Sequence, residues 1–462
     1  MHNGAKYASA YFNDETMEFG TFELEMSKTE MTCKKQEINI MIDKSGSMDE
    51  GCEDGNSKMD QIKYVTNNIL HYVATHCKTD NVSMSVKAFN TRVEPIIDKT
   101  SVSTDNLSTL KNRIRMINPE DGTNVEHALK DMRDFEFSQL NADNNNIFMS
   151  DGDANDGETR QEELVKLVDE RATNYFIGFG LEHNPRLFSA LSDAVNSSYY
   201  FVDKIEKSGT AYGEILHGIL FRLLSNVKIE IENGFIYDWK TNNWQTEIFV
   251  GNMSGEMKRT FHILTSNKDA VRILVNGNVV NSCANLCEEI RFTGETEDLT
   301  RMFYRQRTQE MLYKAKEFNN NDKMNHDDTR IMKNEMKAFI EEMTNFMKTN
   351  ELTEDRLMKN LCDDIVIIHR TIGTEYGHMY SCSRQTSQGT ERLHTTSDTP
   401  KRQKITRCMP TTPYKNRRAV FDFCEDVDEY DYDELDNHVM SQPCYTEEQA
   451  AVIESISNNN DE

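Results

Sequence analysis

The chain contains little tryptophan, little proline and comparatively few basic residues. Its 462 residues include 2 Trp and 7 Pro, and its 52 Lys and Arg are outnumbered by 78 Asp and Glu. The resulting net charge of −26 repels phosphate backbones, which argues against nucleic acid as the main partner. Apolar residues still make up 37% of the chain, which is enough for ordinary hydrophobic cores.

Long apolar runs are missing as well. No stretch of about 18 consecutive apolar residues occurs, so we expect no membrane span. The first twenty residues lack a basic segment followed by an apolar one, so we expect no secretory signal. The 10 cysteines include no Cys-x-x-Cys pair, and in a chain without a signal they are expected to be free thiols. Together these features predict an intracellular, cytoplasmic protein.

Strand-like and helix-like patterns alternate between residues 37 and 224. The strand candidates are 37–43, 82–89, 146–150, 174–179 and 198–202. Amphipathic helical patterns cover 58–77, 124–135, 162–172 and 213–224. This alternation predicts an α/β fold over residues 37–224, with a doubly wound, mostly parallel sheet and helices on both faces.

The pattern changes to a period of two after residue 224. Residues 225–299 alternate apolar and polar side chains and contain Asn-Gly pairs at Asn233-Gly234 and Asn276-Gly277, which predicts an antiparallel β domain. A strand-like segment within residues 1–30 has the same character. We expect it to pair with this later domain, since it would otherwise leave an unpaired edge.

The last part of the chain is predicted to be helical and then disordered. Apolar residues at three- and four-residue spacing predict a helical region over 300–382. Residues 383–462 have few apolar anchors, and we expect a disordered tail there. Near its end, Val452 and Ile456 stand at helical spacing, which predicts a short helix that docks on this protein or on a partner. A frayed terminus with no role is the alternative.

Oxygen-bearing side chains cluster at three predicted loop tips. Asp43, Ser45 and Ser47 follow the first strand, Thr123 precedes a helix, and Asp151 follows another apolar strand. Because sites in parallel α/β sheets form beyond the carboxyl ends of the strands, we expect these five residues to lie together. Hydroxyl and carboxylate oxygens suit Mg²⁺, with Mn²⁺ or Ca²⁺ as alternatives.

The three motifs Asp-x-Ser-x-Ser, Gly-Thr-Asn and Ser-Asp-Gly together resemble the metal-ion-dependent adhesion site of von Willebrand factor A-type (vWA) domains. The resemblance covers about residues 37–224. It implies that Ser45 and Ser47 bind the metal directly, and that Thr123 joins them when a ligand is present. It also implies that Asp43 and Asp151 act mostly through waters or hydrogen bonds.

The resemblance implies a module that is not an enzyme and that captures an Asp or Glu side chain of a protein partner through the metal. Two alternatives stay open. In a structural or virion scaffold, the metal would only brace the loops. In a metal-dependent hydrolase, Asp43 would act as the nucleophile beside Mg²⁺. Lys44 and Ser45 favour the adhesion-type loop over the hydrolase, and no second acid or base is placed by a motif.

Overall fold

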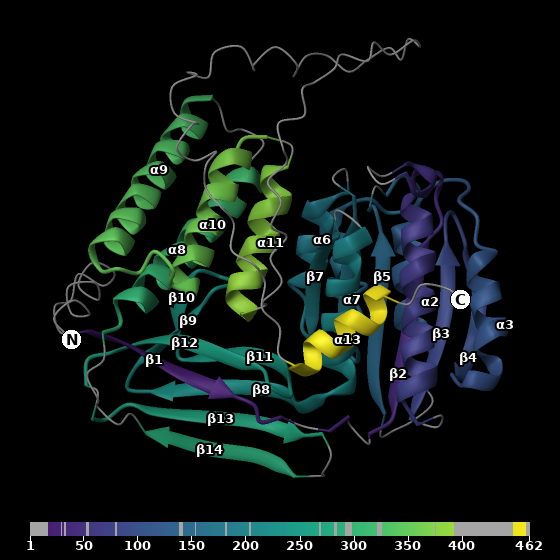
Figure 1. Ribbon diagram of the computed structural model, residues 1–462, viewed down its shortest axis with the longest axis horizontal. Helices are drawn as coiled ribbons and strands as arrows, with labels where there is room; N and C mark the ends of the chain where they lie inside the picture. The colour runs from purple at the N-terminus through teal and green to yellow at the C-terminus, as the bar shows by residue number, and fades with distance from the viewer. Residues whose placement is uncertain are drawn as a thin grey trace.

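The computed structural model describes most of the chain as three parts that pack side by side: an α/β module, a β sandwich and a group of helices (Figure 1). The described residues are 17–391 and 447–458, except for 29, 32–33, 52–54, 79–80, 138–141, 153, 181–182, 203–204, 268, 281–283, 292–297, 321–325 and 375.

A six-stranded sheet forms the centre of the α/β module. Its order is β4-β3-β2-β5-β6-β7. The parallel strands are β2 (Gln36–Asp43), β3 (Val82–Phe89), β5 (Asp143–Ser150), β6 (Thr173–Phe179) and β7 (Ser197–Val202), and the antiparallel edge strand is β4 (Val93–Ser101). The predicted doubly wound, mostly parallel sheet is therefore confirmed.

Helices cover both faces of this sheet, because successive side chains of a strand point to opposite sides. Ile40 and Ile42 pack on one side, in the same core as side chains of three helices: α2 (Lys58–His76), α3 (Thr104–Arg115) and α7 (Ile205–Leu220). Met41 packs on the other side, in the same core as side chains of α4 (Val125–Asp134), α5 (Gln161–Val165) and α6 (Pro185–Ser192).

Two predicted helices of this module have different bounds from those expected: one is shorter, and the other begins and ends earlier. The helix predicted over 162–172 is reduced to α5, because Asp169 binds the backbone and guanidinium of Arg171 and the chain turns there. The helix predicted over 213–224 ends at Leu220, where α7 ends. Leu224 belongs to the next strand, β8, and packs in the core of the sandwich.

The β sandwich consists of two four-stranded antiparallel sheets. One has the order β1-β12-β9-β10, and the other has the order β11-β8-β13-β14. The strands of the first are β1 (Glu18–Glu25), β12 (Lys258–Thr265), β9 (Phe235–Asp238) and β10 (Asn243–Gln245). Those of the second are β11 (Glu247–Ser254), β8 (Arg222–Glu232), β13 (Arg272–Val279) and β14 (Asn285–Arg291). The expected antiparallel β region is therefore present.

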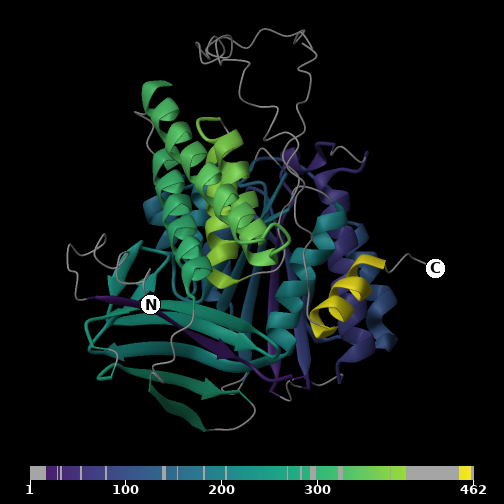
Figure 2. The same ribbon diagram turned by 60° about the vertical axis from the view of Figure 1, so that its left-hand side comes forward.

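The N-terminal strand β1 belongs to the sandwich and not to the α/β module that directly follows it. Its residues pair with β12 from Glu18↔Thr265 to Glu25↔Lys258. Phe22 of β1 stacks on Phe261 and contributes to the sandwich core. The first and the middle parts of the chain thus share one sheet, as the strand pattern predicts (Figures 1 and 2).

Four helices pack above the sandwich and beside the α/β module (Figure 2). They are α8 (Thr300–Asn320), α9 (His326–Thr349), α10 (Arg356–Thr371) and α11 (Gly377–Thr390). Among the described residues, none of the helices combines the length and apolar character that a bilayer crossing requires.

The prediction that the helical region ends at residue 382 is wrong, because α11 continues beyond it. Several polar side chains of α11 are buried. Arg384 is 1% exposed and forms an ion pair with Asp364 at 3.1 Å, and the Gln385 amide donates to the Trp239 carbonyl at 2.8 Å. The polar composition of this segment does not predict a buried helix, because its burial depends on hydrogen-bond and ion-pair partners elsewhere in the protein. Residues 392–446 and 459–462 of the predicted tail lie outside the described residues.

The short helix predicted near the C-terminus is present as α13 (Glu447–Asn458), and it packs on the α/β module (Figure 1). Val452 and Ile456 are buried in the same core as α2 and α7. The amide of Asn68 in α2 donates to the Ile456 carbonyl at 2.6 Å. Of the two docking surfaces that the sequence left open, the structure shows the one on this protein.

Candidate metal centre

The five predicted ligand residues lie at the carboxyl ends of β2 and β5 and in the loop before α4. Asp43 is the last residue of β2, and Asp151 directly follows β5. Ser45 precedes, and Ser47 belongs to, the short 3₁₀ helix η1 (Gly46–Asp49). Thr123 lies two residues before α4. The neighbouring ends of parallel strands therefore place all five at one edge of the sheet.

Asp43 is fully buried, and both of its carboxylate oxygens accept hydrogen bonds. Oδ1 accepts from the Ser45 backbone N–H at 2.8 Å, and Oδ2 accepts from the Ser150 hydroxyl. Burial and then the charge of Asp151 raise the pKa of Asp43 to about 7, although the hydrogen bonds from Ser150 and Ser45 oppose this. Two carboxylates so close in a buried site favour a cation between them.

The hydroxyl groups of Ser45 and Ser47 lie together, with their oxygens 3.1 Å apart. Ser45 is buried and Ser47 is half-buried. The Gly46 backbone N–H donates to the Asp121 carbonyl at 3.0 Å, which attaches this loop to the loop that carries Thr123. The two predicted direct ligands are therefore adjacent and held against the third loop.

Thr123 is buried, and its backbone is bonded to the loop that follows β5. Its N–H donates to Asn155 Oδ1 at 2.8 Å. Its carbonyl accepts from the backbone N–H groups of Asn155 and Asp156 at 3.1 and 3.2 Å. These reciprocal bonds fasten the Thr123 loop to the Asp151 loop.

One carboxylate oxygen of Asp151 accepts a hydrogen bond, and the other has no hydrogen-bond partner. Oδ2 accepts from the ammonium of Lys58 at 3.0 Å, and Lys58 also binds Glu50 at 2.7 Å. Oδ1 is buried and has no hydrogen-bond partner. Gly152 follows with φ +78°, and a Cβ there would lie 2.3 Å from the ring of Phe188, so this turn requires glycine.

Three residues of this edge were not predicted from the sequence: Ser150, Lys58 and Asn155. Ser150 directly precedes Asp151 within a motif that we recognised, so a signal was available. Lys58 is the first residue of α2 and Asn155 lies in an irregular loop. Nothing in their local sequence indicates contact with Asp151 or Thr123.

The donor set fits a hard cation. Three hydroxyls and two carboxylates supply only oxygen, and the buried Asp151 Oδ1 lacks a partner that a bound ion or its water would provide. Within the described ranges, no group of three or more His, Cys, Asp and Glu residues could hold a metal. A site on this edge therefore depends on the serine and threonine hydroxyls.

The sequence of this region matches a known domain family. Residues 38–153 match the von Willebrand factor type A domain, so the chain contains a domain of this class. None of the curated proteins matches the chain significantly.

One solved structure extends the likeness in fold beyond that domain. A von Willebrand factor type A protein from Catenulispora acidiphila matches 80% of this chain and 96% of its own, with a TM-score of 0.50 and 13% identity. A paralogue of ArnB from Sulfolobus acidocaldarius matches 80% of this chain and 99% of its own, with a TM-score of 0.48 and 11% identity. At such identities the likeness concerns the fold alone.

Proposed function

We propose that the chain is a metal-dependent protein interaction module, in which Mg²⁺ at the edge described above captures an Asp or Glu side chain of a partner. The observation that carries this proposal is the buried, unpartnered Oδ1 of Asp151 beside the buried carboxylate of Asp43. The von Willebrand factor type A domain supports it, since domains of this class often mediate protein–protein interaction. An intracellular setting stays a prediction.

Ser45 and Ser47 would bind the ion directly, with Thr123 joining them, and Asp43 and Asp151 would act through water. The bound ion would supply an electrophilic position for a carboxylate from outside. Since its direct ligands would be mostly neutral hydroxyls, the ion would keep most of its charge for that carboxylate. The protein's own contribution is to orient the hydroxyls through the bonds between the three loops.

The geometry does not favour the hydrolase alternative. A nucleophilic carboxylate needs an oxygen that a substrate can reach. Asp43 is 0% exposed, and both of its oxygens already accept hydrogen bonds from Ser45 and Ser150. The scaffold alternative, in which the metal only braces the loops, differs from the interaction module in its response to an acidic ligand.

Metal binding is tested with the double variant Ser45→Ala and Ser47→Ala. We expect its affinity for Mn²⁺ or Mg²⁺ to fall by at least roughly tenfold, since two hydroxyl ligands are lost. Calorimetric titration measures the affinity, and circular dichroism checks the fold. Ser108→Ala, on the exposed surface of α3, is the control and should bind metal as the wild type does. An unchanged affinity in the double variant would refute the metal site.

Capture of an acidic group is tested separately. The probe is a short peptide with one Asp, and its control is the same peptide with Asn. We expect the Asp peptide to bind in Mg²⁺ and not in EDTA, and the Asn peptide to bind in neither. If metal binds but neither peptide does, the metal serves as a brace and the scaffold alternative is correct.

A further inference from the structure

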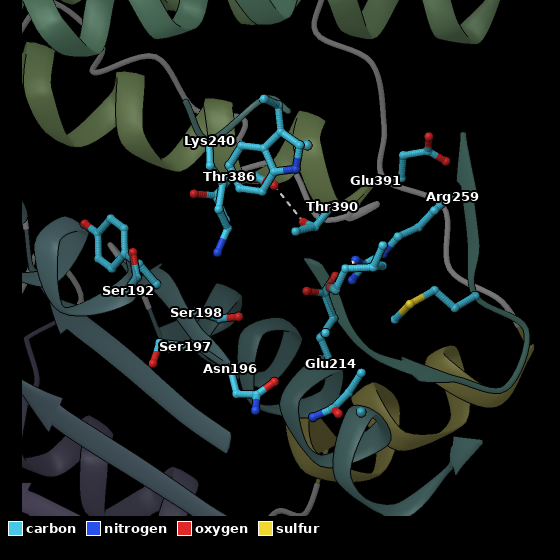
Figure 3. A pocket seen from close by; sticks show the side chains of 18 of the residues that line it. Ser192, Asn196, Ser197, Ser198, Glu214, Lys240, Arg259, Thr386, Thr390 and Glu391 are labelled. Atoms are coloured by element: carbon cyan, nitrogen blue, oxygen red, sulfur yellow. Dashed lines mark hydrogen bonds between the residues drawn. The ribbon is translucent and has the colours of Figure 1, made fainter. Parts of the chain in front are cut away.

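A cavity of about 490 Å³ lies where the α/β module, the sandwich and the helices meet (Figure 3). Thr173 and Ser197, the first residues of β6 and β7, line it, so it lies at the opposite end of the sheet from Asp43. The other walls come from β11, from the segment after β9, and from α11. This volume is within the range of sites that hold small molecules.

The β11 wall of the cavity is irregular. β11 is an edge strand of the sandwich, and its pairing with β8 shifts register around Phe249, Gly251 and Met253. Such bulges redirect side chains and are common beside functional sites. Phe249 and Asn252 of this strand line the cavity, and Phe249 is 45% exposed. The Phe249 ring is thus available to an apolar part of a bound molecule, whereas the Asn252 amide donates to the Thr173 hydroxyl at 2.9 Å and accepts from the Asn226 N–H at 3.4 Å.

Lys240 supplies a positive charge on the opposite wall, next to Trp239. Its side chain lines the cavity and remains in contact with solvent. Protein atoms around the ammonium lower the pKa of Lys240 because they reduce its hydration. The carboxylates of Asp193 and Asp238 oppose this lowering, and the charges of Arg259 and Lys316 add to it. Among the described residues, no carboxylate lies within the 4.0 Å that defines an ion pair with its ammonium.

The acidic residues nearest to Lys240 are engaged elsewhere. Asp238 accepts from the Lys240 backbone N–H at 3.0 Å, and its other oxygen accepts from Thr241 and Gln245 at 2.8 and 3.2 Å. Asp193 pairs with Lys316 at 3.9 Å.

Glu391, which also lines the cavity, forms an ion pair with Arg305 at 2.7 Å. Glu214 and Glu256 also line the cavity, but toward α7 and the turn before β12. Three other cations line the cavity: Lys258 pairs with Glu23, Lys316 pairs with Asp193, and Arg259 donates to the Val250 carbonyl. Lys240 therefore remains as a counter-charge for an anion.

We propose that this cavity binds a small molecule through an oxyanion group, a phosphate or a carboxylate, with Lys240 as its counter-charge. Hydroxyl and amide groups face one another across the cavity: Thr386 and Thr390 of α11 on one side, Asn196 and Ser198 on the other (Figure 3). They suit a polar body, and Phe249 suits an apolar part. A volume of about 490 Å³ suits a small molecule.

The proposal is tested by protection of Lys240 from acylation. The full-length protein is treated with an acetylating reagent, and modification of each lysine is followed by mass spectrometry. Inorganic phosphate and acetate are the two probes, and they distinguish the two oxyanion classes. We expect one of them to slow acetylation of Lys240 at least threefold while acetylation of Lys348, an exposed lysine of α9, stays unchanged.

Variants give the second readout. Lys240→Met should weaken binding of the protecting anion roughly tenfold or more, since a hydrogen bond to a charged group is lost. Lys240→Arg should retain it, and Lys348→Met should bind as the wild type does. Calorimetry measures these affinities. Equal acetylation of Lys240 with and without both anions, or equal anion binding by Lys240→Met and wild type, would overturn the proposal.

Discussion

Individual buried charges explain much of the candidate metal centre. Asp43 and Asp151 are both nearly inaccessible to solvent in a chain that carries a net charge of −26. Burying two carboxylates costs free energy unless they are paired or bonded. Lys58 and the hydroxyl of Ser150 provide part of that compensation. The remaining acceptor, Asp151 Oδ1, has no partner in the protein, and the proposed metal site rests on it.

Glu310 of α8 is a half-buried carboxyl group that predicts a pH dependence of stability. Burial raises its pKa to about 8, with Lys314 opposing, and Gln306 donates to it at 2.9 Å. Its contribution to stability is therefore fully present below the unfolded value of 4.5 and is lost as pH rises through about 8. Glu310→Gln stays neutral, so it should become more stable relative to wild type between pH 5 and pH 8.

Urea unfolding of both proteins at pH 5 and pH 8 measures this difference. Glu317→Gln, on the same helix, is the control and should show no such trend, because its side chain is exposed. If the stability difference between Glu310→Gln and wild type is the same at both pH values, Glu310 is ionised in the folded protein.

At the scale of elements, α13 shows how a distant segment completes the α/β module. Gly213 of α7 lies so close to it that a Cβ there would be 2.4 Å from the side chain of Ile453. Helices approach this closely only where a small residue stands at the contact. Together with the bond from Asn68 to Ile456, this indicates a specific packing arrangement and not a loose association.

The double variant Val452→Asp and Ile456→Asp should release α13 from α2 and α7. Two buried aliphatic side chains contribute about 3 kcal/mol, at roughly 1.5 kcal/mol each, so we expect the module to lose about that much stability. Hydrogen exchange should become faster in α7 around Gly213. Ala451→Asp, on the exposed face of the same helix, is the matched control. Unchanged exchange in the double variant would mean that α13 does not stabilise the module.

At the scale of the whole molecule, the α/β sheet and the helices α8–α11 share one apolar core. Phe148 and Phe176 of the sheet belong to the same cluster of buried residues as Phe339 of α9. Tyr380 of α11 lies edge-on to Phe201 of β7, with their ring centroids 6.2 Å apart. α11 therefore packs beside the edge strand β7, an edge that would otherwise be open to other chains.

Tyr380→Ala should destabilise the α/β sheet and the helices α8–α11 together. We expect a loss of about 3 kcal/mol, as for other buried aromatic side chains. Hydrogen exchange should become faster in β7 as well as in α11. Tyr376→Ala, which removes a half-buried ring near the start of α11, should have a smaller effect. Faster exchange confined to α11 would show that the helices and the sheet are separate cooperative units.

Much of this architecture could be predicted because its signals are local. The five parallel strands carry short apolar segments, alternating with polar residues in β2 and β3, and α2 has a long apolar face. β4 and α3 were not predicted. β4 contains Glu94, Pro95 and Asp98 and pairs on one side only, so its pattern lacks the apolar run of a buried strand. The part of α11 beyond residue 382 was missed because its polar residues are stabilised by partners distant in sequence.

The sequence by itself determined which oxygen-bearing residues stand at the ends of the strands. In a parallel sheet these ends meet at one edge, so the order of motifs along the chain was sufficient to group Asp43, Ser45, Ser47, Thr123 and Asp151. Only the tertiary structure decided that Lys58 binds Asp151, that α13 packs on α7, and that a cavity forms beside Lys240. The physical reason is that these features arise from contacts between distant segments, and such contacts depend on three-dimensional packing and leave no periodic pattern in the local sequence.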